Sequence, residues 1–277
     1  MSATERRRPA AAAQPAFVLH SYDWSESSLI LDLLTQDEGR QVVAAKGAKR
    51  PYSQLRPVLL PFQRVLVQLS RSKGEAELDE VRTLRSAEWA GSAAILPASR
   101  LLSGFYLNEL LMKFLPRGQA QPFVFECYAQ TLRSLAQAGG GAVSVEGAAL
   151  RAFELLLLQH LGLLPDLSVE TIGGNELDAS AVYVLKPEMG LVGSTGSREP
   201  GLDGASWIGL QAALMSGHLE ALQAACLAHP VALRATLRAV LAYHLDGARL
   251  RTRDLIHELR RFDPPGGSAT PVDGIPR

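Results

Sequence analysis

The hydrophobic periodicity of this chain changes near Ser86 from the two-residue spacing of β-strands to the wider spacing of α-helices. From Ala16 to about Arg85, short apolar runs are separated by turn residues, and in one run Val65, Val67 and Leu69 are expected to point inward. Five such runs in about 70 residues predict a small closed sheet such as an OB barrel. Period alone does not separate that barrel from another small one.

Helical spacing of the apolar residues dominates the chain after Ser86. A helix over about 145–161 is apolar nearly all round, which is typical of the central helix of a bundle. The pattern is irregular from about 163 to 205, apart from a hairpin that pairs residues 183–185 with 191–192. Helices resume near Ser206, and Thr252 is predicted to cap the last one.

These patterns predict an α+β protein with two domains. An N-terminal OB-fold β-barrel is expected at residues 15–86, followed at 87–262 by an α-helical domain that carries the irregular hairpin insertion. Residues 1–14 and the proline- and glycine-rich residues 263–277 are expected to be a disordered arm and tail. No run of about 18 uncharged apolar residues occurs, so we expect no transmembrane span.

The charges of the chain are sorted into blocks, although 28 basic and 28 acidic residues give a net charge of zero. Residues 74–233 hold an excess of acids, whereas residues 40–73 contain eight basic side chains and no acidic one. A local basic surface is the electrostatic footprint of a polyanion, so this block predicts a DNA-binding site. A solvated surface stripe is the alternative. The eight predicted DNA-binding residues are Arg40, Lys46, Lys49, Arg50, Arg56, Arg64, Arg71 and Lys73.

Aromatic side chains that could stack on bases are scarce in this block. Tyr52, in the basic loop, and Phe62 are the candidates, and Phe62 is more readily interpreted as a core residue. A second basic cluster, at residues 234–261, includes Arg234 and Arg238, four residues apart on one helix. It could pair with the acidic helical domain, or it could contact a nucleic acid or another partner.

Enzyme motifs are absent from the sequence, so no catalytic site is predicted. The glycine-rich stretch 193–196 is not followed by the Lys-Ser/Thr pair that holds nucleotide phosphates, and the six histidines lack the paired spacing of metal ligands. Cys127 and Cys226 lie in apolar helical patterns and are expected in the core. Two cysteines provide neither a disulfide framework nor a four-ligand zinc site, which fits a reducing cytoplasm.

Several strings, in their order and spacing, resemble the RecO family of bacterial recombination mediators over nearly the whole chain, from Phe17 to about Arg261. The strings are Ser25-Glu26-Ser27-Ser28-Leu29-Ile30 with Thr35, Ala45-Lys46-Gly47-Ala48-Lys49-Arg50, Thr83-Leu84-Arg85-Ser86-Ala87-Glu88, Gly104-Phe105-Tyr106-Leu107-Asn108-Glu109-Leu110-Leu111, Leu150-Arg151-Ala152-Phe153-Glu154-Leu155 with Leu161-Gly162, and Leu250-Arg251-Thr252-Arg253-Asp254-Leu255.

The resemblance implies an N-terminal OB fold before a helical domain, binding of single- and double-stranded DNA, and annealing of complementary strands. It also implies cooperation with RecR to replace single-strand binding protein by RecA, in the cytoplasm at the nucleoid. The acidic C-terminal tail of single-strand binding protein would dock on the helical domain, where Lys186, Arg234 and Arg238 are our candidates. Lys46, Lys49, Arg50 and Arg56 are the first candidates for phosphate contacts.

Three charged residues in the matching helical strings, Glu109, Arg151 and Glu154, are expected to have structural roles, because charges on apolar helices are usually paired across a bundle. The chain departs from the family in one respect. Some members carry a four-cysteine zinc site, but residues 167–174 here contain no cysteine, so zinc and other cofactors are not expected. We expect Leu167, Ile172 and Tyr183 to close this subdomain by apolar packing.

One alternative to the DNA-binding function is an adaptor whose basic barrel binds an acidic protein partner. A fluorescent oligonucleotide shift at two salt concentrations would separate the two. A hydrolase is a further alternative, but the sequence has no nucleophile, base and orienting group at recognisable spacing.

Overall fold

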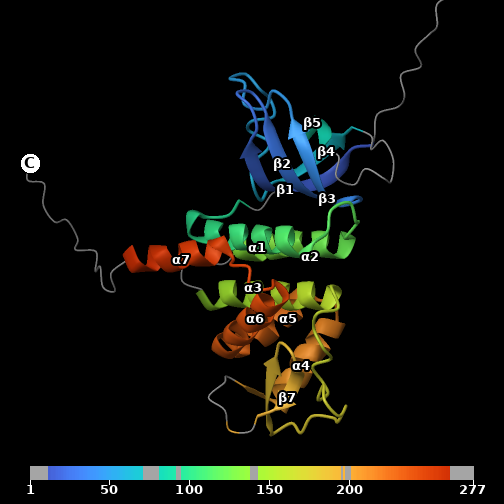
Figure 1. Ribbon diagram of the computed structural model, residues 1–277, viewed down its shortest axis with the longest axis vertical. Coiled ribbons are helices and arrows are strands. Elements are labelled where there is room, and N and C mark those ends of the chain that lie inside the picture. Colours follow the sequence, from blue (N-terminus) through green and yellow to red (C-terminus); the bar gives the residue numbers. More distant parts are fainter. Residues whose placement is uncertain are drawn as a thin grey trace, which may run out of the picture.

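The computed structural model describes residues 12–70, 81–91, 95–137, 143–194, 196 and 201–262. In it a β-barrel lies on successive layers of helices, and a small sheet lies at the far end of the helices (Figure 1). The barrel strands are β1 (Gln14–Asp23), β2 (Leu29–Thr35), β3 (Gly39–Ala45), β4 (Arg64–Leu69) and β5 (Arg82–Trp89). The predicted fold class, a barrel followed by a helical domain with a hairpin insertion, is confirmed.

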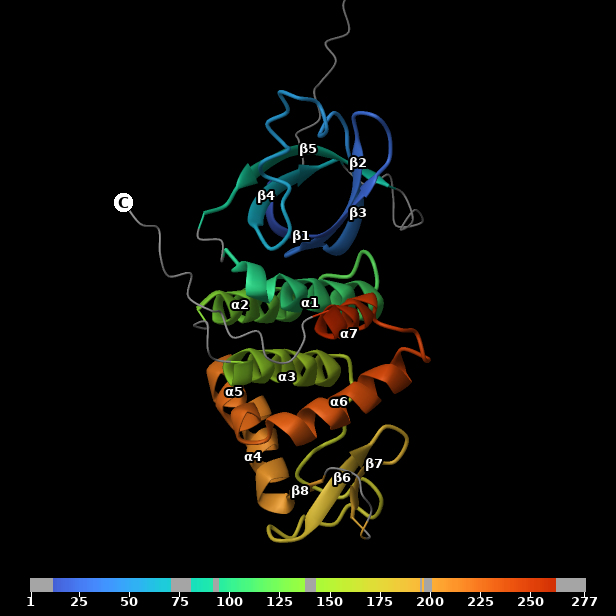
Figure 2. The same cartoon turned by 90° about the vertical axis from the view of Figure 1, so that its left-hand side faces the viewer.

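The barrel is closed, with the strand order β1-β2-β3-β5-β4 and β4 paired again with β1 (Figure 2). Only β3 and β5 pair in parallel among these strands; the other neighbours are antiparallel. Alternation along each strand directs one face inward. Val65, Val67 and Leu69 are all buried in the barrel core, as their spacing predicted.

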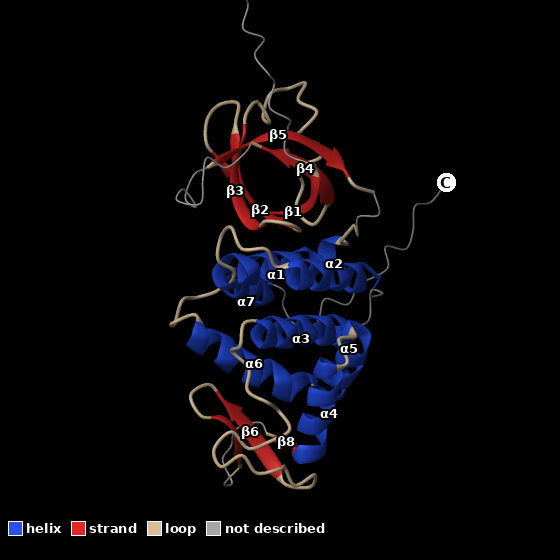
Figure 3. Cartoon of the chain, turned by 90° about the vertical axis from the view of Figure 1, so that its right-hand side faces the viewer, coloured by secondary structure: helices blue, strands red, loops and turns tan. Residues whose placement is uncertain are grey.

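The helical domain consists of one 3-10 turn and seven helices among the described residues. They are η1 (Ala98–Arg100), α1 (Leu101–Phe114), α2 (Pro122–Gln137), α3 (Val143–His160), α4 (Gly204–Met215), α5 (Leu219–Ala228), α6 (Pro230–His244) and α7 (Arg251–Phe262). Helices α1, α2 and α7 form the layer beneath the barrel, and α3 lies in the next layer with α5 and α6 (Figure 3). The residues from Arg151 to Leu158 are all buried, so α3 is the central helix that its uniform apolar pattern predicted.

The predicted hairpin is present as β6 (Val182–Lys186) paired with β7 (Gly190–Gly193), and a third strand, β8 (Leu202–Asp203), extends the sheet. The sequence analysis missed β8, which has only two residues. Packing of Leu167 and Tyr183 is confirmed, but Ile172 is 59% exposed, so its assignment to the core was wrong. Thr171 is the residue of this segment that contacts the sheet, because its backbone amide donates to the Leu191 carbonyl at 2.9 Å and its hydroxyl accepts a hydrogen bond from the Leu191 amide at 2.8 Å.

One hydrophobic cluster joins the outer face of the barrel to the helices, and a second, separate cluster fills the barrel interior. Phe17 of β1 lies 5.1 Å, centroid to centroid, from both Phe125 and Tyr128 of α2. The Asn108 amide donates to the Leu19 carbonyl at 2.8 Å, and the Tyr128 hydroxyl donates to Asn108. An interface with apolar packing and satisfied buried polar groups fixes the wall of the barrel against the helices.

The last helix is capped by a residue from another helix. The Glu109 carboxylate of α1 accepts hydrogen bonds from the backbone amides of Arg251 and Thr252, at 2.8 and 3.0 Å. The predicted cap, Thr252, instead lies inside the first turn and donates its hydroxyl to Glu109. The prediction was wrong because a cap from a distant segment leaves no local sequence signal. Arg251 and Arg253 belong to the first turn of α7.

The structural roles expected for the charged residues of the helical strings are confirmed. Arg151 and Glu154 of α3 form an ion pair at 2.5 Å, and the Tyr106 hydroxyl also donates to Glu154. Arg253 donates to the same hydroxyl at 2.7 Å and lies over the Tyr106 ring. This network joins α1, α3 and α7 inside the domain.

No single helix in the described part of the chain is long and apolar enough to cross a membrane. Helices α5 and α6 meet that length and composition only as a pair, and they are bent by 109° at the break between them.

Candidate nucleic-acid interface

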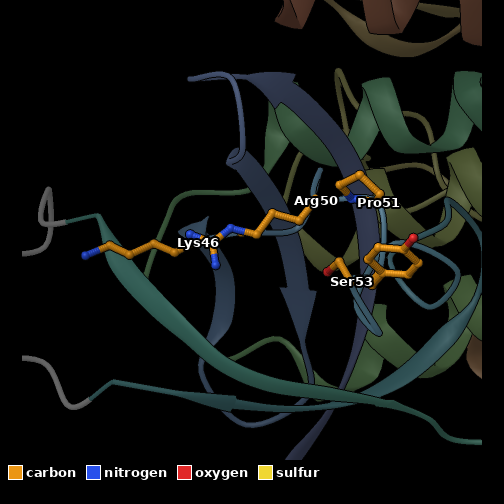
Figure 4. A pocket seen from close by; sticks show the side chains of 6 residues that line it. Lys46, Arg50, Pro51 and Ser53 are labelled. Carbon is orange, nitrogen blue, oxygen red and sulfur yellow. The ribbon is translucent and has the colours of Figure 1, made fainter.

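Among the described residues of the 40–73 block, the exposed basic side chains lie on the loop between β3 and β4, most of which runs over the side of the barrel away from the helices (Figure 2). An open hollow in this loop is lined by Lys46, Gly47, Arg50, Pro51, Tyr52 and Ser53. The Arg50 side chain passes over Gly47 and extends towards Lys46 (Figure 4). Two cations therefore lie on the same side of this loop.

Backbone hydrogen bonds give the loop a defined shape. The Arg50 amide donates to the Gly47 carbonyl at 3.2 Å, and the Ser53 amide donates to the Arg50 carbonyl at 3.0 Å. Gly47 adopts a φ of 73°, a left-handed conformation that glycine takes without steric cost. The adjacent Ala48 is only 1% exposed and packs into the barrel core. The loop thus presents its charged side chains from an ordered backbone.

Three of the predicted DNA-binding residues on this loop, Lys46, Arg50 and Arg56, are exposed. Among the described residues, no acidic side chain forms an ion pair with any of the three. Exposed cations without a carboxylate partner are available to phosphate groups. The structure therefore brings these three residues together on one loop.

Lys49 lies on the same loop but is bound to its neighbours. Its ammonium group lies 3.1 Å from the Asp23 carboxylate and donates to the Ser25 carbonyl at 3.1 Å. Its backbone amide donates to the Ser27 carbonyl at 3.0 Å. These contacts hold the β1–β2 turn against the β3–β4 loop. Asp23 also adds an acid that the sequence count of residues 40–73 did not include.

Arg40 and Arg64 lie at the interface with the helices instead. The Arg40 guanidinium forms two hydrogen bonds with Asp32, at 2.8 and 2.7 Å, and donates to the carbonyls of Met112 and Leu115 at the end of α1. The Arg64 guanidinium lies 5.6 Å from the centroid of the Phe125 ring. We leave both out of the proposed contact surface, because their charged groups face the helical domain.

The other predicted site residues are not part of this loop. Arg71 and Lys73 lie outside the described residues. The candidates for partner binding are on two contacting elements of the helical domain: Lys186 is half-buried at the end of β6, and Arg234 and Arg238 are exposed on α6.

Sequence reasoning missed three exposed residues on the barrel. Tyr22 and Trp24, at the end of β1 and in the following turn, are 50% and 58% exposed, and Arg85 is exposed on β5, beside β3. A tryptophan among the turn residues after Tyr22 was the available signal, because large aromatic side chains are usually mostly buried. Of the two aromatic candidates, Tyr52 is 95% exposed, while Phe62 is buried against Phe105, which confirms its core assignment.

No group of three His, Cys, Asp or Glu side chains among the described residues could hold a metal ion. Both cysteines are buried, as predicted, and burial raises the pKa of Cys127 to about 11 and that of Cys226 to about 12. A thiol with so high a pKa is protonated near neutral pH and is a poor nucleophile.

Two family models match successive parts of this chain. The family model described as Recombination protein O N terminal matches residues 11–91, and the model described as Recombination protein O C terminal matches residues 98–254. The DNA repair protein RecO of Variovorax paradoxus is 44% identical over 254 residues, which cover 89% of this chain and 96% of that protein. That of Polaromonas naphthalenivorans is 45% identical over 249 residues, again 89% and 96% of the two chains. With both domain models matched in order and close relatives aligned over nearly their full length, this chain belongs to the RecO family of DNA repair proteins.

Proposed function

We propose that this protein binds single- and double-stranded DNA through the β3–β4 loop of its barrel and anneals complementary strands. We further propose that it acts with RecR to replace single-strand binding protein by RecA. The observation that carries the DNA-binding proposal is the position of Lys46, Arg50 and Arg56, all exposed, on one loop of the barrel, where Lys46 and Arg50 line a common hollow. Membership of the RecO family supports the annealing and loading steps.

Annealing by such a surface requires attraction and no catalytic group. Two DNA strands repel each other through their phosphates, and cations that contact both backbones reduce this repulsion. Base pairing then supplies the free energy of the reaction.

The salt dependence of binding tests the loop assignment. Replacing Lys46, Arg50 and Arg56 together by alanine should weaken binding to single strands of any sequence. It should also reduce the slope of log K against log salt concentration by about 2, since each phosphate contact contributes about 0.7 on single strands. Fluorescence anisotropy of a labelled oligonucleotide, titrated at several salt concentrations, measures both quantities.

A matched control removes the same charge elsewhere. Lys113, Arg133 and Arg249 are exposed on the helical domain, and the triple alanine variant at these positions should keep the wild-type slope. Equal losses in the two triple variants would show that net charge, and not the loop, determines binding. A loop variant with unchanged affinity and slope would refute the assignment, and the adaptor function would then account better for the basic loop.

We propose that the acidic tail of single-strand binding protein docks on the helical domain near Lys186, Arg234 and Arg238. Strand β6 contacts α6, so the three residues come from adjacent elements. Titration with a tail peptide should give weaker binding to variants in which these residues are replaced by glutamine. Unchanged peptide affinity would place the docking site elsewhere on the protein.

A further inference from the structure

Three aromatic side chains are exposed beside the basic loop. Tyr22, Trp24 and Tyr52 are 50%, 58% and 95% exposed. A single exposed hydrophobic side chain is ordinary on a protein surface and needs no explanation. Here two separate chain segments, the end of β1 with its following turn and the β3–β4 loop, each expose large rings next to cations. Such a surface is complementary to a ligand that has both flat apolar faces and negative charge.

Direct contacts hold the two segments together. The Lys49 ammonium group lies 3.1 Å from both the Asp23 carboxylate and the Ser25 carbonyl, and these two residues flank Trp24 in the chain. The Lys49 amide also donates to the Ser27 carbonyl, and the Gly47 amide donates to the Ser28 hydroxyl at 3.3 Å. The turn that carries Trp24 is therefore fixed beside the loop that carries Tyr52.

The charges are unevenly distributed around these rings. Asp23 and Lys49 compensate each other next to Trp24. Lys46 and Arg50 line the hollow together with Tyr52, and neither forms an ion pair with a described acidic residue. In the same turn, Glu26 is an exposed acid for which no ion pair is found among the described residues. The surface therefore combines an aromatic part that carries this one acid with an adjoining cationic part. Single-stranded nucleic acids have the matching composition, with base faces on one side and phosphates on the other.

We propose that Trp24 and Tyr52 stack against unpaired bases of a single strand whose phosphates contact Lys46 and Arg50. The inference rests on the proposed function and adds to it a selection for unpaired bases. In a duplex the bases stack on one another and offer no face to a protein side chain, whereas an exposed ring can stack on any unpaired base. A base held by its face also keeps its pairing edge accessible, which is the geometry that annealing to a complementary strand requires.

Abasic DNA distinguishes the contribution of base stacking to the binding affinity from the contribution of charge, because it keeps the phosphates and lacks the bases. The full-length protein is titrated with three labelled probes at one salt concentration: a 15-nucleotide dT strand, a strand of the same length whose central residues are abasic, and a duplex hairpin. The wild-type protein should bind the dT strand more tightly than the abasic strand. The affinity of the variant W24A/Y52A for the dT strand should be at least about fivefold lower than that of the wild type. This factor is the lower end of the effect of removing one stacking ring. The variant's affinity for the abasic strand and the duplex should not change.

Two further variants control for other causes. W24F/Y52F keeps both rings and should keep the preference for dT. Trp89 is 63% exposed at the end of β5 that pairs with the start of β4, next to the helical domain, and W89A should behave like the wild type. A W24A/Y52A protein that still prefers dT, or a W24F/Y52F protein that loses this preference, overturns the inference. Wild-type protein that binds dT and abasic strands equally refutes only stacking, whereas a wild type that binds none of the probes refutes the proposed function itself.

Discussion

Two regions of the barrel each contain a basic residue of the same sequence block paired with an aspartate, yet the two pairs differ in their surroundings. On the wall that faces the helices, Arg40 and Asp32 lie 2.7 Å apart, and their side chains are 13% and 3% exposed. Where the β1–β2 turn meets the β3–β4 loop, Lys49 and Asp23 lie 3.1 Å apart, and their side chains are 32% and 79% exposed. One pair supports the domain interface, and the other lies beside the proposed DNA surface.

The difference shows that burial, and not the presence of a partner, decides what an ion pair does for the fold. Moving a charge out of water costs several kcal/mol, so a buried charge that loses its partner is strongly destabilising. An exposed pair gains little, because water screens it and two long side chains must be ordered to form it. Basic residues that are equivalent in the sequence can therefore have unrelated roles.

Removing Arg40 should have the largest effect. The variant R40M leaves Asp32 buried without its partner and deprives the Met112 and Leu115 carbonyls at the end of α1 of their donor. We expect the free energy of unfolding to fall by about 3–5 kcal/mol, the range for breaking a buried pair. Urea denaturation followed by circular dichroism measures this change. DNA binding per folded molecule should stay the same, since the Arg40 guanidinium faces the helical domain.

A double variant distinguishes a broken pair from a general loss of packing. In D32L/R40M both charges are replaced by apolar groups, so no buried charge is left without a partner, and a large part of the lost stability should return. The comparison between the two regions of the barrel fails if R40M lowers the free energy of unfolding by less than about 1 kcal/mol, because the buried pair would then contribute no more than an exposed pair does. It also fails if R40M reduces the salt slope of DNA binding as loop variants do.

Much of the fold could be predicted from the sequence, because its signals are local. Alternation in the run that contains Val65, Val67 and Leu69 follows from one face of a strand being buried, and the uniform apolar pattern of α3 follows from burial on all sides. The two-residue strand β8 and the cap of α7 by Glu109 were missed. Both depend on partners distant in the chain, and neither has a periodicity of its own.

The candidate site could be predicted only in part, for the same physical reason. A count of charges along the chain located the basic loop, since Lys46, Arg50 and Arg56 are close in sequence and lie on one loop. It could not separate them from Arg40, whose partner Asp32 lies outside the counted block. Nor could it place Trp24 beside the loop, because the contacts of Lys49 with the β1–β2 turn exist only in the folded chain.

Removing Lys49 should have the smallest effect on stability, and it tests the exposed pair of the comparison as R40M tests the buried one. K49M breaks a pair whose aspartate is 79% exposed and can be hydrated at once, so the free energy of unfolding should change by less than about 1 kcal/mol. The same urea titration that is used for R40M measures it. DNA affinity should nevertheless fall, because the Asp23 carboxylate next to Trp24 is then no longer compensated and repels phosphates. The variant K49M/D23N removes both charges and should recover affinity towards the wild-type value. Failure of D23N to restore binding would mean that the Lys49 ammonium group itself is needed, either as a fourth phosphate-binding cation or through its hydrogen bond to the Ser25 carbonyl, which holds the Trp24 turn. Loss of the preference of K49M/D23N for dT over the abasic strand would indicate the second.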